Sequence, residues 1–119
     1  MVNETFHDIL SRMANGLGFV LSAEAVERLA DHYELVMQAN PLLHLTGPVS
    51  AEEFAERHTL ESLAILKFLP KGAKFADIGP GGGFPSIPCL IARPDLSATL
   101  IESKIRKAEF LIDAAQKLG

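Results

Sequence analysis

The sequence has few of the residues that build cross-linked or membrane-spanning proteins. Its 119 residues include one cysteine, Cys89, and no tryptophan. A single cysteine excludes an internal disulfide framework and a cysteine-built zinc site, and we expect no metal. No uncharged apolar run reaches the roughly 18 residues of a transmembrane helix, and the N-terminus shows no basic or apolar region of a secretory signal. These absences predict a cytoplasmic protein without a membrane partner.

Basic residues are scarce in the first half of the chain. Residues 1–66 hold three Lys and Arg against ten Asp and Glu, whereas residues 67–119 hold eight against five. The overall net charge of −4 argues against a uniformly basic nucleic-acid binder. Any binding to phosphates should therefore involve the second half.

Apolar residues at helical spacing predict three helical regions before residue 70, at 4–17, 23–39 and 51–68. Ser22 is the expected N-cap of the second, and Asn40-Pro41 is expected to end it, because a residue before proline avoids the helical conformation. Ser50 and Glu53 have the spacing of a capping box at the start of the third. His7 and His32 are expected on helix surfaces.

The hydrophobic period changes after residue 70. Lys74–Ile78 is expected to form a buried strand, and Ala98–Ile101 a second strand, with helices at 84–92 and 104–118. Strand, helix, strand and helix at this spacing predict a βαβα unit with a parallel pair. The predicted class is therefore α/β, with a helical region at 1–70 followed by an α/β region at 71–119.

A glycine-rich loop, Gly79-Pro80-Gly81-Gly82-Gly83, joins the first strand to the next helix. The dinucleotide fingerprint G-x-G-x-x-G fails in both registers, because Phe84 and Ser86 stand where its third glycine belongs. The pattern is instead D-x-G-x-G-x-G, starting at Asp77. An acidic residue there would repel a pyrophosphate, but it suits a ligand with a cationic amino-acid end.

A second carboxylate, Glu102, follows the second strand, where it can accept hydrogen bonds from ribose hydroxyls. One carboxylate near a cationic end and one at a ribose are typical of an S-adenosyl-L-methionine site. The alternative is a glycine turn of purely structural use, with Glu102 as a solvated strand end.

Several segments carry a family resemblance. Residues 75–88, with sequence FADIGPGGGFPSIP, resemble the cofactor motif of the bacterial small-subunit (16S) rRNA guanine-N7 methyltransferases, the glucose-inhibited division protein B family. Its doubled proline is absent from generic methyltransferases. Three further segments match the family in order, namely Leu45-Thr46, Arg57–Leu63 and Leu100–Ser103. Four positions depart from the family pattern, namely His44, Glu61, Ser86 and Arg106.

The resemblance implies the roles of the site residues. Gly79 and Phe84 would contact S-adenosyl-L-methionine, with Asp77, Gly81 and Gly83 shaping the loop and Glu102 holding the ribose. Phe84 could equally be a core residue at a helix start. The resemblance identifies no general base, and guanine N7 is itself a nucleophile.

Five residues are the candidates for contact with small-subunit ribosomal RNA, namely Arg57, His58, Lys104, Arg106 and Lys107. The alternatives are a structural role for His58 and a solvated helix face for the cation cluster at 104–107.

The family fold is a Rossmann-like sheet of about seven strands, of which this chain supplies two. The chain is therefore expected to be the truncated N-terminal part of such an enzyme, to bind the cofactor weakly or not at all by itself, and to self-associate through exposed sheet. Two other functions remain open: a non-catalytic module that docks RNA or protein, and a methyltransferase of the same fold with another substrate.

Overall fold

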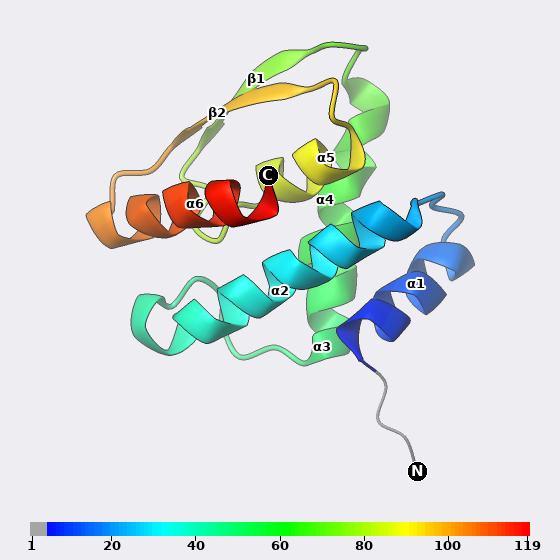
Figure 1. Cartoon of the computed structure of the whole chain (residues 1–119), viewed down its shortest axis with the longest axis horizontal. Coiled ribbons are helices and arrows are strands. Elements are labelled where there is room, and N and C mark those ends of the chain that lie inside the picture. Colours follow the sequence, from blue (N-terminus) through cyan, green and yellow to red (C-terminus); the bar gives the residue numbers. More distant parts are fainter. Residues whose placement is uncertain (1–4) are drawn as a thin grey trace.

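The computed structural model describes residues 5–119, so the N-terminal residues over which no secretory signal was found lie outside the described residues. Helices come first and a small sheet follows (Figure 1). In chain order the elements are α1 (Phe6–Gly16), α2 (Ala23–Leu43), α3 (Ala51–Glu53), the π-helix η1 (Phe54–Leu60), α4 (Glu61–Leu63), the 3₁₀ helix η2 (Ala64–Phe68), β1 (Lys74–Ile78), α5 (Ser86–Ala92), β2 (Ser97–Ile101) and α6 (Ile105–Leu118).

Helix α2 is longer than its sequence predicts. Its N-cap is Ser22 as predicted, with the hydroxyl oxygen accepting from the Ala25 N–H at 3.0 Å. The predicted end at Asn40-Pro41 is wrong, because the helix continues to Leu43. Pro41 lies in the last turn, where its missing N–H costs one intrahelical bond. The helix ends at His44, which adopts a left-handed φ of 51° and donates its N–H to the Asn40 carbonyl.

The third helical region begins at the predicted capping box, in which Ser50 and Glu53 each accept the other's backbone N–H. It is not a uniform α-helix. A π-helical stretch, Phe54–Leu60, separates two short α-helical turns, and a 3₁₀ turn follows. This wide turn carries Arg57 and His58, two of the predicted site residues, and π-helical turns often occur at functional sites.

The sheet is a parallel pair, as predicted, in which Asp77 lies opposite Leu100 and Ile78 opposite Ile101. The helices lie on one side of it (Figure 1). Exposure alternates along both strands, and the outward side chains of Ile78 and Ile101 are 79% and 51% exposed. The prediction of a buried strand at 74–78 is therefore wrong, because the helices among residues 5–119 cover one face only.

The main core joins the helical region to the α/β region. Its fully buried side chains include Leu10, Leu29, Val36 and Phe54, and Phe84 packs against the same cluster from beyond residue 70. The helices thus pack against the residue that directly follows the glycine loop. The division of the chain into a helical region at 1–70 and an α/β region at 71–119 stays a prediction. None of the described helices is long and apolar enough to cross a membrane.

Candidate functional site

The glycine loop leaves β1 at Ile78 and enters α5 at Ser86. Three of its glycines have positive φ angles, 71° at Gly79, 59° at Gly81 and 100° at Gly83. These values favour glycine, because other L residues rarely adopt them. The loop begins as a continuation of the sheet, since the Gly79 N–H donates to the Ile101 carbonyl at 2.8 Å.

The three glycines differ in the space around them. A Cβ at Gly79 would meet no atom within 4 Å, and one at Gly81 would meet only the Leu45 carbonyl oxygen at 3.9 Å. A Cβ at Gly83 would lie 2.3 Å from Cδ1 of Ile87. Gly79 and Gly81 therefore leave open space beside the backbone, whereas Gly83 permits close packing of the loop on α5.

Two carboxylates flank the loop, one from each strand. Asp77 accepts the N–H of Ser86 at 3.3 Å, at the start of α5. Glu102, directly after β2, accepts the N–H groups of Gly81 at 3.1 Å and Lys104 at 3.0 Å. The backbone hydrogen bond from Lys104 is the main reason that the pKa of Glu102 is lowered, with burial opposing it and Gly81 and the Lys107 charge adding to it. Glu102 is thus an ionised carboxylate at neutral pH.

Phe84 packs into a group of aromatic rings below the loop. Its centroid lies 5.0 Å from that of His32, 5.1 Å from that of His58 and 5.5 Å from that of Phe54. The ring is half-buried, so packing accounts for part of its surface. Its contact with a cofactor stays a prediction.

His32 is a site residue that the sequence analysis missed. It was expected on a helix surface, but its side chain is 1% exposed and its Nε2 lies 2.8 Å from the Gly82 carbonyl oxygen. A signal was available, because His32 stands three residues after Leu29 and four before Val36, both of which are buried. That spacing places all three on one helical face.

His58 and Arg57 are adjacent on the π-helix, but their side chains differ in exposure. His58 is half-buried, with Nε2 at 2.8 Å from the Thr46 hydroxyl. Burial lowers the pKa of His58, partly opposed by the charge of Glu61. Arg57 is exposed, and contact of either residue with RNA stays a prediction.

The predicted cation cluster lies at the start of α6. Lys104 and Arg106 are exposed, and Lys107 is half-buried. Arg106 also lines a groove with residues at the end of α2, among them Leu42, which is 78% exposed. The cluster and Arg57 lie on different elements, and their contact with RNA stays a prediction.

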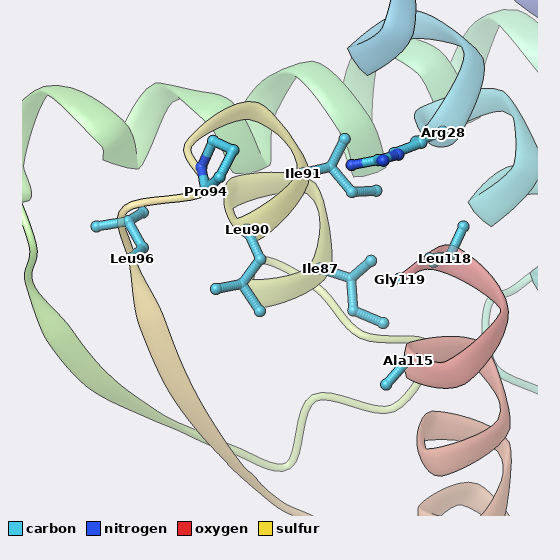
Figure 2. Close-up of a pocket in the computed structure, with 9 residues that line it drawn as sticks. All are labelled: Arg28, Ile87, Leu90, Ile91, Pro94, Leu96, Ala115, Leu118 and Gly119. Atoms are coloured by element: carbon cyan, nitrogen blue, oxygen red, sulfur yellow. The ribbon is translucent and has the colours of Figure 1, made fainter.

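A cavity of about 340 Å³ lies apart from these residues, between α5, the end of α6 and Arg28 of α2 (Figure 2). Its other walls are mainly aliphatic, from Ile87, Leu90 and Ile91 of α5 to Leu118 of α6. None of the predicted cofactor or RNA residues lines it. Within residues 5–119, no group of three or more His, Cys, Asp or Glu side chains is placed to hold a metal ion.

Comparison with known proteins assigns the family. The profile of the rRNA small subunit methyltransferase G family matches residues 25–119. The chain belongs to this family. It is 42% identical over 106 residues to ribosomal RNA small subunit methyltransferase G of Sorangium cellulosum, covering 87% of this chain and 44% of that protein.

Two further relatives carry the same name. That of Pelotomaculum thermopropionicum is 38% identical over 89% of this chain and 45% of its own length. That of Myxococcus xanthus is 34% identical over the whole of this chain and 55% of its own. The predicted family, and with it a partial Rossmann-like methyltransferase fold, is confirmed. The chain spans about half the length of the curated relatives it matches.

Proposed function

We propose that this chain forms part of a cytoplasmic, S-adenosyl-L-methionine-dependent enzyme that methylates a guanine N7 in small-subunit ribosomal RNA. One observation carries the proposal. The glycine loop lies between two carboxylates, Asp77 in β1 and Glu102 directly after the adjacent parallel strand β2. Ligands of α/β sheets bind at this carboxyl edge of the strands, and the family name supports methylation of small-subunit rRNA, with guanine N7 as the proposed target.

The residues present fit the cofactor. The backbone at Gly79 and Gly81 is open to close approach, and Asp77 would face a cationic amino-acid end. Both Glu102 oxygens accept a backbone N–H, but each keeps a second lone pair that can accept a ribose hydroxyl. The hydrogen bonds from Gly81 and Lys104 also fix the direction of this carboxylate.

When bound, the cofactor supplies a methyl group on a positively charged sulfur. The protein's task is then to position guanine N7 in line with that methyl group, because the N7 lone pair needs no deprotonation. By holding the ribose, Glu102 would help to orient the cofactor for that alignment. No residue of this chain is assigned as a general base.

Removing the charge of Asp77 tests the cofactor site. Asp77→Asn keeps an oxygen that can accept the Ser86 N–H but loses the charge opposite the cationic end. We expect the dissociation constant for S-adenosyl-L-homocysteine to rise at least about tenfold, about 1.4 kcal/mol. Nuclear magnetic resonance titration, followed at the Gly79 and Gly81 amides, measures even millimolar binding. Asp113→Asn on α6, where Asp113 pairs with Lys117 at 3.0 Å, is the matched control. Equal affinity in both variants would contradict the assignment.

Replacing the cations of α6 tests the RNA surface. The triple variant Lys104→Gln, Arg106→Gln and Lys107→Gln is expected to weaken binding to a small-subunit rRNA fragment. The slope of log K against log salt should fall by up to about three, since each duplex phosphate contributes about 0.9. The control replaces the exposed residues Lys67, Lys71 and Lys74 by Gln, with the same charge change. Equal slopes in the two triple variants would leave the α6 cluster as a solvated helix face.

Two further expectations stay predictions. They are cofactor binding by the 119-residue chain alone that is weak or absent, and its self-association. The exposed Ile78 and Ile101 side chains make the sheet face the candidate surface for that association.

A further inference from the structure

A buried histidine of α2 holds the glycine loop from below. The side chain of His32 is 1% exposed, and its Nε2 lies 2.8 Å from the carbonyl oxygen of Gly82, fifty residues along the chain. A carbonyl oxygen can only accept, so Nε2 carries the proton and donates it. Burial lowers the pKa of His32 to about 4, with the Gly82 bond opposing that shift. The ring is therefore neutral at pH 7.

The loop is held at two neighbouring residues by side chains from two separate parts of the chain. The Gly81 N–H donates to Glu102 after β2, and the Gly82 carbonyl accepts from His32 on α2. These two bonds fix both ends of the segment between the Gly81 nitrogen and the Gly82 oxygen. Glycine has wide conformational freedom, so these bonds select one of many loop conformations.

The His32 ring also supports the residue after the loop. It lies 5.0 Å from the Phe84 ring, which His58 approaches from 5.1 Å. Gly82 lies in the glycine loop, and Phe84 directly follows it. The imidazole ring of His32 lies beside both residues. An aliphatic side chain of the same size would fill the space but could not hold the Gly82 carbonyl.

We propose that His32 is a positioning residue for cofactor binding, whose Nε2–H holds the Gly82 carbonyl inward and so keeps the open backbone at Gly79 and Gly81 presented to the ligand. The inference rests on the proposed function of the loop. The competing explanation is a core histidine that stabilises the fold without affecting the ligand. The two explanations predict different ligand affinities for a variant that has an aromatic ring without a hydrogen-bond donor at position 32.

Two variants and one control separate these explanations. His32→Phe keeps a ring beside Phe84 and removes the donor. His32→Gln restores an N–H donor near the position of Nε2. Val36→Ala, one turn further along α2 at a side chain that is 0% exposed, removes core contacts and keeps the hydrogen bond between His32 and Gly82. Hydrogen exchange of the Gly81, Gly83 and Ser86 amides reports loop order, and titration with S-adenosyl-L-homocysteine reports affinity.

We expect His32→Phe to speed exchange of the three amides and to raise the dissociation constant roughly tenfold, with His32→Gln recovering most of both. Val36→Ala should lower the unfolding midpoint while leaving affinity unchanged. Unchanged loop exchange and affinity in folded His32→Phe would overturn the proposal. If His32→Phe does not fold, His32→Gln is compared with the unaltered chain. The proposal is then overturned if His32→Gln folds but differs from the unaltered chain in both loop exchange and affinity. Absence of ligand binding by the unaltered chain would agree with the expectation that this chain binds weakly or not at all by itself, and the exchange measurements would then decide whether His32 holds the loop.

Discussion

Replacing Gly83 by alanine is expected to lower the free energy of unfolding by roughly 3 kcal/mol. The new Cβ would lie 2.3 Å from Cδ1 and 2.7 Å from Cγ1 of Ile87. Ile87 is itself 7% exposed, and a β-branched side chain in a helix has one strongly preferred rotamer, so it has little room to move. The φ of 100° at Gly83 adds backbone strain. Urea denaturation followed by circular dichroism measures the loss.

Gly79→Ala is the matched control, because its φ of 71° carries strain but a Cβ there meets no atom within 4 Å. It should cost about 1 kcal/mol. Ile87→Ala should cost less in the Gly83→Ala chain than in the unaltered chain, since the new Cβ already displaces its two nearest atoms, Cδ1 and Cγ1 of Ile87. Equal costs at Gly83 and Gly79 would show that Ile87 moves aside and that the close packing of the loop on α5 is not specific.

This difference among the glycines could not be read from the sequence. The pattern D-x-G-x-G-x-G predicts a loop between a strand and a helix, and the loop is there. It treats all three glycines alike. Only the fold shows that Gly79 and Gly81 face open space and Gly83 faces Ile87, because the distinction depends on how α5 turns back against the loop.

Local signals predicted the secondary structure well. The first strand has the predicted bounds, Lys74–Ile78, and the second begins one residue earlier than predicted. The N-cap at Ser22 and the capping box at Ser50 and Glu53 form as predicted. These features depend on residues within one turn or one strand, so a short stretch of sequence contains their cause.

The wrong predictions share a different cause, which is dependence on distant residues. The strand at 74–78 is apolar enough to be buried, but burial needs helices on both faces. His32 was expected on the surface because the sequence shows no partner for it, whereas Gly82 on a distant loop supplies the partner that makes its burial possible. The continuation of α2 past Pro41 is the exception, because it is local: His44 in the left-handed conformation donates its N–H to the Asn40 carbonyl and ends the helix after the proline.

The folded chain is expected to lose about 2 kcal/mol of stability between pH 7 and pH 5 through His32 alone. The pKa of His32 is about 4 in the folded chain and near 6.5 when unfolded. The unfolded state therefore binds a proton first as the pH falls. The stabilisation that comes from keeping this histidine neutral is complete above pH 6.5 and is lost progressively as the pH falls toward 4. Burial also lowers the pKa of His58, which acts in the same direction.

Urea denaturation at pH 7, 6 and 5 measures this dependence. Carboxylates whose pKa values are lowered, such as Glu102, lose their contribution mainly below their ordinary pKa near 4, so this range isolates the histidines. His32→Phe should remove most of the slope, and His7→Phe, at an exposed position on α1, should leave it unchanged. A wild-type stability that stays constant from pH 7 to pH 5 would mean that the His32 ring accepts a proton without leaving the core. The hydrogen bond to Gly82 would then not depend on a neutral imidazole, since a charged ring also donates from Nε2.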